Sequence, residues 1–315
     1  MARRRLAVVL LAPQAEAAEI DALRRAVGLV EPFHVAPHVT LVPPTNVAEP
    51  DVPDVLGVLR RVAATSRPLE LEVGPAATFL PETPTLHLAV AAADPEALSS
   101  LRGRLRCGPF DRPDVWPFHP HATIRESAEP ELIAAAVTAL AGLIQRWSVA
   151  SVHLLEQRRQ GPDHPRHGQA HWVAIREEPL GGPAVVGRGG IELALRTVSM
   201  VEPEVAGLLG TDPTEPPSRP GPRPLVVVAE DPGTPGPVVG AALGSVGNGS
   251  TAAEVVSVGV AEDRRGEGIG RQLVNAWCSE AARRGAEVAV GPDHPSLVAV
   301  GFEPAAGVAV RSLGR

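Results

Sequence analysis

The sequence contains no tyrosine, only two cysteines and no long apolar segment. Without tyrosine, any mechanism that needs a phenolic proton donor is excluded. Cys107 and Cys278 are far apart, so they offer neither a disulfide framework nor the spacing of a zinc site, and a reducing cytoplasm is the expected location. No apolar run approaches the ~18 residues that a membrane-spanning helix needs, so no membrane association is expected.

Positive charge is also scarce. The chain has 29 basic and 36 acidic residues, and its formal net charge of −7 argues against broad electrostatic capture of long nucleic acid. A small phosphate ligand in a local basic pocket is compatible with this balance. The 315 residues suffice for two domains, and the 44% of hydrophobic residues is ordinary for a soluble globular protein.

The N-terminal segment imitates a secretory signal, because Arg3, Arg4 and Arg5 precede the apolar run LAVVLLA. Its apolar core has only about seven residues, at the low end for a signal peptide, so a buried first strand is the preferred interpretation.

Strand-like and helix-like patterns alternate through the first half of the chain, which predicts an α+β domain. Strands are expected over residues 6–11, 39–42, 69–73, 86–90, 122–124, 148–156 and 171–176. Helices are expected over residues 15–30, 52–66, 95–107 and 130–146.

The composition changes at residues 179–190, which read PLGGPAVVGRGG. This glycine- and proline-rich stretch is the best candidate for a linker. We therefore predict a domain over residues 1–181, a linker over 182–190 and a second domain over 191–315. A further proline-rich stretch, 211–224, is interpreted as a loop inside the second domain, because the strand-like LVVVAE follows it.

Two histidine motifs carry the chemistry of the first domain: His38 and Thr40 in PHVTLV, and His121 and Thr123 in PHATIR. On a strand, residues i and i+2 share a face, so each imidazole has a hydroxyl beside it. One neutral histidine can accept a proton while the other, protonated, donates one to a leaving oxygen. The threonines can bind non-bridging phosphate oxygens, and Arg125 can neutralise phosphate charge.

Other roles for these and nearby residues stay open. His34 with His38 and His119 with His121 could bind a metal, although metal sites usually recruit carboxylates or thiolates too, and none stands beside these histidines. His164, His167 and His171 are interpreted as an exposed hairpin. Trp116 could stack on a base, but a core position is favoured.

The paired PHxT motifs, separated by a domain-scale interval, resemble the 2H phosphoesterase superfamily, which includes bacterial 2′-5′ RNA ligases and cyclic phosphodiesterases. The resemblance covers residues 1–180. It implies two pseudo-symmetric α+β lobes with antiparallel sheets around a cleft. It also implies metal-independent action on 2′,3′-cyclic or 2′,5′-linked phosphodiesters of a small nucleotide or an RNA terminus. The catalytic set that it implies is His38, Thr40, His121 and Thr123, with acid and base unassigned.

A glycine-rich turn follows the apolar strand at 255–260 in the second half and opens an amphipathic helix over about 268–285. Free amides at a helix N-terminus can bind a pyrophosphate, and glycines let it approach closely. The lysine of a P-loop is missing, which argues against an NTPase. The late position and the lack of a following acidic residue argue against a dinucleotide fold.

The run RRGEGIG, with VGFEP at 300–304, resembles the GNAT N-acetyltransferase family over about residues 188–315. The matching motif residues are Arg265, Gly268 and Gly270. The resemblance implies an α/β domain that binds acetyl-CoA, with the pyrophosphate on the turn and the pantetheine paired with the strand. The residues it assigns to the cofactor are Val258, Val260, Arg265, Gly266, Gly268, Gly270 and Arg271.

Two departures weaken the prediction of acetyl transfer. Leu297 occupies the position where this family often has a tyrosine that acts as the acid for the leaving thiolate. The segment that would form the acceptor site is also short, and only residues 202–209 resemble a helix. Glu254 could act as a base through water, although a surface carboxylate is equally ordinary there. Acetyl-CoA binding is therefore expected more firmly than transfer.

Three alternatives remain. The acetyltransferase could be the physiological enzyme beside a nucleotide-binding first domain. The chain could be a non-catalytic sensor of nucleotide phosphates and acetyl-CoA, or a metal-dependent hydrolase.

Overall fold

The chain divides into two units in the computed structural model, Met1–Gly181 and Gly182–Arg315. The structure describes residues 2–30, 35–159, 170–182, 184–188, 191–210, 223–231, 237–247 and 251–313. No helix within these ranges is long and apolar enough to cross a membrane.

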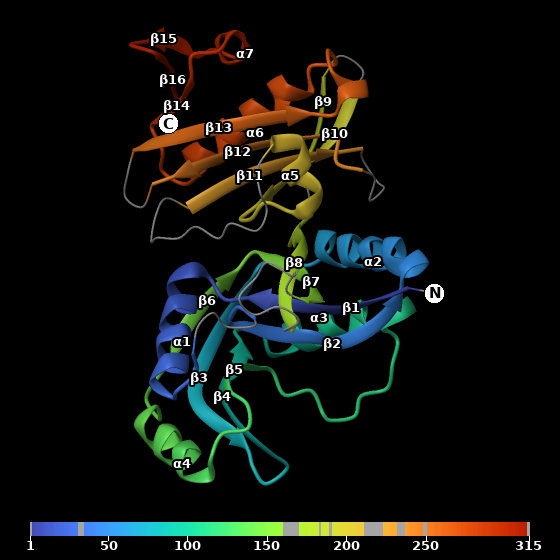
Figure 1. Ribbon diagram of the computed structural model, residues 1–315, viewed down its shortest axis with the longest axis vertical. Helices are drawn as coiled ribbons and strands as arrows, with labels where there is room; N and C mark the ends of the chain where they lie inside the picture. Colours follow the sequence, from blue (N-terminus) through green and yellow to red (C-terminus); the bar gives the residue numbers. More distant parts are fainter. Residues whose placement is uncertain are drawn as a thin grey trace. The chain divides into compact units, whose positions relative to one another are not determined.

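Unit 1 contains eight strands, four α-helices and two short 3₁₀ turns among its described residues. In chain order (Figure 1) these are β1 (Arg3–Leu11), α1 (Gln14–Ala26), β2 (His38–Ala48), η1 (Glu49–Asp51), α2 (Val52–Ala64), β3 (Leu69–Phe79), β4 (Thr83–Ala92), α3 (Pro95–Leu105), η2 (Gly108–Phe110), β5 (His121–Arg125), α4 (Pro130–Ala139), β6 (Gln145–Val149), β7 (Ser151–Arg159) and β8 (Ala170–Pro179).

The strands form one antiparallel sheet in the order β6-β3-β4-β5-β2-β1-β7-β8. Its two four-stranded halves meet where β2 and β5 pair at Val39 and Ala122. Each half contributes its innermost strand to this junction, and each innermost strand begins with one of the motif histidines. The α+β class and the two-lobed antiparallel arrangement predicted from the sequence are confirmed.

One predicted strand was wrong: residues 148–156 belong to two strands. β6 ends at Val149 and pairs with β3, whereas β7 begins at Ser151 and pairs with β1. Because one residue spans at most ~3.6 Å, the end of β6 and the start of β7 lie close together despite their separation in the sheet order. The sheet is therefore strongly curled, as Figure 1 shows in the course of β3 and β4 across the direction of β1 and β2.

All four helices of unit 1 pack on one face of the sheet. Ile20 of α1, Val55 of α2, Leu101 of α3 and Ile133 of α4 belong to one buried cluster with alternate residues of the strands. At the start of α3 the Asp94 side chain accepts a hydrogen bond from the amide of Glu96, which stabilises the first turn. The opposite face of the central strands is left for the motif side chains.

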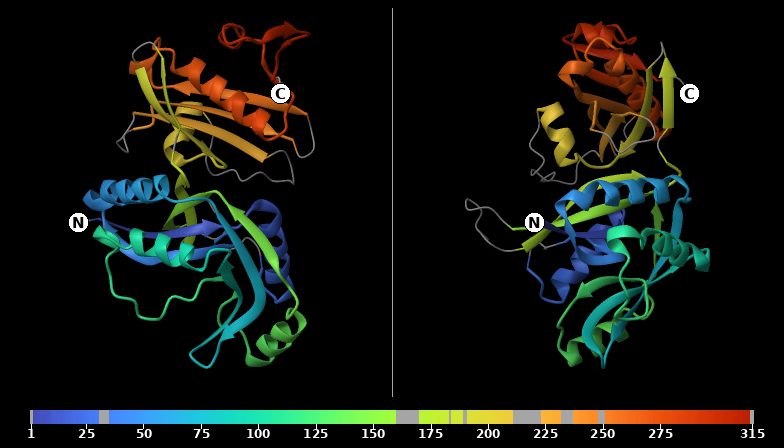
Figure 2. Two further views of the ribbon diagram at one scale, coloured as in Figure 1. Left: turned by 180° about the vertical axis from the view of Figure 1, so that it is seen from behind. Right: turned by 90° about the vertical axis from the view of Figure 1, so that its right-hand side faces the viewer.

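Unit 2 also contains eight strands, with three α-helices and one 3₁₀ turn among its described residues. They are β9 (Ala184–Arg188), β10 (Ile191–Val198), α5 (Pro203–Leu209), β11 (Arg223–Glu230), β12 (Gly240–Val246), β13 (Ala252–Val260), η3 (Glu262–Arg264), α6 (Ile269–Arg283), β14 (Val288–Pro292), α7 (Pro295–Val298), β15 (Glu303–Ala305) and β16 (Val308–Ser312) (Figure 2).

The predicted linker, residues 182–190, is not simply a connection. Its residues 184–188 form β9, which pairs antiparallel with β10 at the edge of the sheet. Gly181 and Gly182 precede this strand with positive φ angles, and Gly187 lies within it.

The sheet of unit 2 has the order β15-β16-β14-β13-β12-β11-β10-β9 and is covered on both faces. Leu225 and Val227 of β11 pack in a cluster with Leu273 and Trp277 of α6. Val226 of β11 and its neighbour Val228 pack with α5 on the opposite side. β13 and β14 are parallel, and the other pairs are antiparallel.

Candidate functional sites

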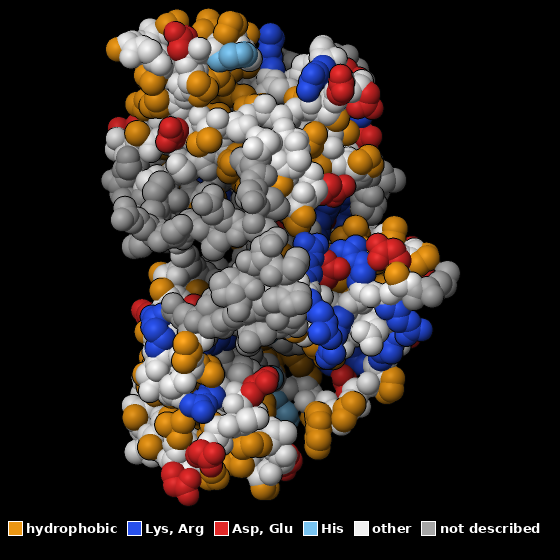
Figure 3. Space-filling model, in the orientation of Figure 1, with side chains coloured by type: hydrophobic (Ala, Val, Ile, Leu, Met, Phe, Trp, Pro, Cys, Tyr) orange, Lys and Arg blue, Asp and Glu red, His pale blue; other side chains and the backbone are white. Residues whose placement is uncertain are grey.

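The motif side chains of β2 and β5 form a compact group on one face of the sheet of unit 1. Val39 and Ala122 are paired and fully buried on the helix side. Antiparallel alternation therefore places His38 opposite Thr123 and Thr40 opposite His121, with all four side chains on the other face. Figure 3 shows histidine side chains at a recess in the surface of this unit.

Each motif histidine is held by the main chain two residues before it. Nδ1 of His38 lies 2.7 Å from the carbonyl oxygen of Ala36, and Nδ1 of His121 lies 2.7 Å from that of His119. A carbonyl can only accept, so each Nδ1 carries the proton of this bond. In the neutral form of either ring, Nε2 is then the nitrogen that can accept a proton.

The electrostatic surroundings of His38 favour its neutral form. Burial lowers the pKa of His38 to about 4, although the hydrogen bond to Ala36 opposes this, and the nearby charges of Arg24 and His121 lower it further. At neutral pH the His38 imidazole is consequently uncharged and able to accept a proton.

Two arginines connect helix α1 to the motif strand β5. Arg24, which is buried, donates to the carbonyl oxygens of Val35 at 2.9 Å and Thr123 at 3.1 Å. Arg125 donates to the carbonyl of Val27 at the end of α1, where the helix dipole favours a cation. The predicted phosphate-binding side chain thus lies on the motif strand and is anchored at the helix end. Arg24 also pairs with Asp21 on the same helix, but its two contacts near the motifs are to main-chain atoms, so no sequence pattern indicated them.

Sequence reasoning also missed an aromatic group beside His121. Phe79 stacks on His87 with ring centroids 4.1 Å apart, and its ring meets that of His121 edge-on at 4.9 Å. His87 also contacts His121, with centroids 5.3 Å apart. The only signal in the sequence was the alternation TLHLAV, which puts His87 and the apolar residues on opposite faces.

The loop before β5 differs from expectation. Trp116 is 64% exposed, so the predicted core position is wrong. Asp114 accepts hydrogen bonds from Arg102 and Arg106 at the end of α3, which fixes the base of the loop and leaves its apolar tip in solvent. These ion pairs hold the pKa of Asp114 below its usual value.

The other histidines that the sequence suggested as metal ligands do not form a metal site among the described residues. His34, His164 and His167 lie outside the described residues, and His171 lies on β8. Within the described ranges, no three His, Cys, Asp or Glu side chains are grouped as a metal site requires.

The glycine-rich turn of unit 2 leads directly into α6. Gly266 and Gly268 have positive φ angles of 86° and 83°, which glycine adopts at little cost. Gly268 is the N-cap of α6, and no side chain caps this helix end. Arg264 holds the turn by contacts to Glu267 and Asp231. The first amides of α6 are therefore presented by main-chain geometry, as an anion site requires.

The edge of β13 opens beside this turn. β13 pairs with β14 only from Ala252 to Glu254 in the described sheet, so the backbone of residues 255–260 has no partner in β14. Val256 is an extra residue in the ladder with β12, because Leu243 faces Ser257 and Gly244 faces Val255. The side chains of Val258 and Val260 pack toward the α6 cluster. Their main-chain groups lie along the opened strand.

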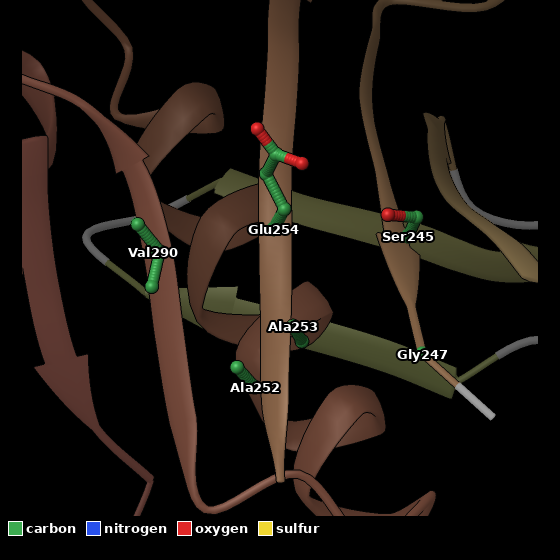
Figure 4. A pocket seen from close by; sticks show the side chains of 6 residues that line it. All are labelled: Ser245, Gly247, Ala252, Ala253, Glu254 and Val290. Carbon is green, nitrogen blue, oxygen red and sulfur yellow. The ribbon is translucent and has the colours of Figure 1, made fainter. Parts of the chain in front are cut away.

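A cavity of about 340 Å³ lies at the segment where β13 pairs with β14, and residues 252–254 and Val290 line it. Figure 4 shows the carboxylate of Glu254 on β13, flanked by Ser245 of β12 and Val290 of β14. Leu297, at the position of the family's tyrosine, is buried against Gly291 and belongs to the core.

Comparison with family models assigns the two units separately. Residues 12–161 match the model of the 2′-5′ RNA ligase superfamily, and residues 201–302 match that of the acetyltransferase (GNAT) family. Both resemblances predicted from the motifs are confirmed.

Similar proteins were found for each unit. A protein of Halalkalibacterium halodurans, named "Putative phosphoesterase BH1439", is 34% identical over 93 residues, covering 30% of this chain and 53% of that protein. The chain spans about half the length of the curated relatives it matches.

Two solved structures are also similar. E. coli LigT complexed with 3′-AMP has 18% identity, covers 57% of this chain and 99% of its own, and has a TM-score of 0.43. The Escherichia coli GNAT family N-acetyltransferase YhbS in complex with CoA has 20% identity, covers 41% and 86%, and has a TM-score of 0.29. By its family matches, the chain joins a segment of the 2′-5′ RNA ligase superfamily type to one of the GNAT acetyltransferase type.

Proposed function

We propose that unit 1 is a metal-independent phosphodiesterase or ligase for 2′,3′-cyclic or 2′,5′-linked phosphodiesters of a small nucleotide or an RNA terminus. The observation that carries the proposal is the matched pair of histidines on adjacent strands, each with Nδ1 on the carbonyl two residues earlier. This arrangement leaves two equivalent Nε2 atoms for proton transfer on the same face as two threonine hydroxyls.

The environment of His38 suggests how the two histidines divide their roles in hydrolysis. His38, kept neutral by burial, accepts the proton of water as its oxygen bonds to phosphorus. His121 in its protonated form gives a proton to the ribose oxygen as the P–O bond breaks. Proton exchange with solvent then restores both rings. Thr40 and Thr123 donate hydrogen bonds to the non-bridging oxygens, and Arg125 compensates their charge.

The test is hydrolysis of the four 2′,3′-cyclic mononucleotides in the presence of EDTA. Wild type is compared with His38→Ala and His121→Ala, and with His294→Ala as a control on an exposed histidine of unit 2. Turnover that only the first two substitutions abolish supports the mechanism, and the phosphate isomer formed reports the polarity of cleavage. Turnover that EDTA abolishes would instead favour a metal-dependent hydrolase. Activity that survives either motif substitution would refute the assignment.

We further propose that unit 2 binds acetyl-CoA. The uncapped start of α6 and the positive-φ glycines fit a pyrophosphate, and the opened edge of β13 fits a chain that pairs by main-chain hydrogen bonds. Arg265, Gly266, Gly268, Gly270 and Arg271 would surround the phosphates. The main chain of Val258 and Val260 would pair with the pantetheine. When bound, the cofactor supplies an activated acetyl group.

The titration of acetyl-CoA by calorimetry tests this second proposal. Saturable binding by wild type, absent at matched concentrations of acetate and inorganic phosphate, is the expected result. Binding without transfer to any amine would agree with the leucine at position 297. Heat indistinguishable from dilution would remove acetyl-CoA as a ligand.

A further inference from the structure

A third histidine shares the face of the two motifs in unit 1. His87 on β4 is paired with Thr123 on β5, and His38 lies opposite Thr123 on the other side. Residues that are directly opposite in a sheet project from the same face. His38, Thr123 and His87 consequently form one row across three adjacent strands, and His121 lies beside this row.

The rings of Phe79 and His87 both contact the ring of His121. Phe79 stacks on His87 at an interplanar angle of 22°, while the ring of His121 stands at 87° to Phe79 and 65° to His87. Stacked and edge-to-face contacts at such distances are favourable geometries for aromatic rings. The imidazole of His121 thus contacts two rings and is also held by the bond of its Nδ1 to the His119 carbonyl.

His87 is itself buried and uncharged. The residue is 5% exposed. Its Nδ1 is buried and has no hydrogen-bond partner among the described residues. Burial and the proximity of His121 lower the pKa of His87 to about 4, although the Thr85 carbonyl lies near enough to oppose this. A neutral His87 ring places no positive charge beside His121.

Building on the proposed phosphodiesterase function, we propose that His87 is a positioning residue for His121. Its ring, braced by Phe79, keeps the His121 imidazole oriented with Nδ1 on the main chain and Nε2 toward the phosphate. His87 acts through its shape and its lack of charge, and transfers no proton itself. A ring of similar size and no charge should therefore replace it.

The experiment compares His87→Ala, His87→Phe and the control Leu88→Ala. Leu88 is the next residue of β4, fully buried on the helix face, so its truncation creates a cavity away from the site. Hydrolysis of 2′,3′-cyclic nucleotides is measured below the unfolding temperature of each variant. His87→Ala should lower kcat about 10- to 100-fold, the range expected for a misplaced catalytic group, with KM nearly unchanged. His87→Phe and Leu88→Ala should both retain the kcat of the wild type.

The tautomer of His121, read by long-range ¹H–¹⁵N correlation, provides a measurement that needs no turnover. Wild type and His87→Phe should show the Nδ1–H form alone, whereas His87→Ala should show a mixture. A loss of kcat in His87→Phe as large as in His87→Ala would overturn the proposal, because the imidazole nitrogens of His87, and not the shape of its ring, would then be required for turnover. A His87→Ala variant with unchanged tautomer would also overturn it. If wild type turns over no phosphodiester, the proposed function fails, and these spectra still decide the role of His87.

Discussion

The two candidate sites use different parts of the polypeptide. The site of unit 1 consists of side chains on adjacent strands, with His38 and His121 each oriented by a carbonyl. The site of unit 2 consists of main-chain groups at the opened edge of β13 and the start of α6. The first should therefore be sensitive to the identity of a few side chains, and the second to backbone conformation.

Buried titratable groups take two forms in this protein. His38 and His87 avoid charge, because their pKa values are lowered to about 4. Ion pairs are buried as well, between Arg176 and Glu178 in unit 1 and in a cluster of unit 2, where Arg196 makes a two-pronged contact with Glu202 and a further contact with Glu230. This cluster ties β10 and β11 to the start of α5, on the α5 side of the sheet.

The largest effect is expected from a substitution that should nearly abolish turnover in unit 1 and leave acetyl-CoA binding in unit 2 unchanged. His121→Gln should lower kcat/KM for a 2′,3′-cyclic nucleotide by about 10²–10⁴-fold, the usual contribution of general acid–base catalysis. Acetyl-CoA affinity should not change, because the residues proposed to bind it all belong to unit 2. Turnover and calorimetry on the same preparation check both statements. A parallel loss of both activities would show that the sites are coupled.

The next effect concerns the ion-pair cluster. Arg196→Met leaves Glu202 and Glu230 in a buried position without their guanidinium, which should cost about 3–5 kcal/mol of stability. Arg283→Met, which removes an exposed pair with Glu280, should cost no more than about 1 kcal/mol. Denaturant unfolding measures both, while retained phosphodiester turnover would show that unit 1 stays folded. Equal costs would contradict the buried-charge interpretation.

A smaller effect should appear in the pH dependence of stability. The unfolded imidazole of His87 titrates near 6.5 and the folded one near 4, so the unfolded state binds more protons between these values. The free energy of unfolding should therefore fall as pH drops from 6.5 toward 4. His87→Phe should reduce the loss between pH 7 and 4.5 by on the order of 2 kcal/mol. Unfolding curves at both pH values test this, and identical pH dependence in the two proteins would contradict it.

The smallest effect tests the main-chain character of the second site. Gly268→Ala places a Cβ at a positive φ with open space around it, so it should cost about 1 kcal/mol through backbone strain alone. Gly285→Ala, just beyond the other end of α6, introduces the same strain far from the turn. Only Gly268→Ala should weaken acetyl-CoA binding, by roughly tenfold if the amides shift by a fraction of an ångström. Equal affinities would place the pyrophosphate elsewhere.

Local patterns predicted much of the fold. The helix expected over 268–285 is α6, Ile269–Arg283, because a glycine turn precedes an amphipathic run and Gly285 follows it. The i, i+2 spacing of each HxT motif assigned histidine and threonine to one strand face, as β2 and β5 show. The catalytic and cofactor roles of these residues remain proposals.

Long-range pairing accounts for what the patterns missed. Residues 148–156 have continuous strand character, but Ala150 passes from a strand paired with β3 to one paired with β1. The expected helix over 130–146 ends at Ala139 because residues 145–149 pair with β3. Propensity describes each segment alone, whereas these boundaries depend on partners more than 60 residues away.

The sequence by itself determined the local features of this protein: the two motif strands, the glycine turn and the family type of each half. Only the tertiary structure brought β2 beside β5 through Val39 and Ala122, and placed His87 and Phe79 against His121. It also left β13 without a β14 partner past Glu254, although β12 stays paired with it to Val260. The physical reason is that side-chain periodicity fixes which face a residue occupies, while the register between distant strands fixes its neighbours.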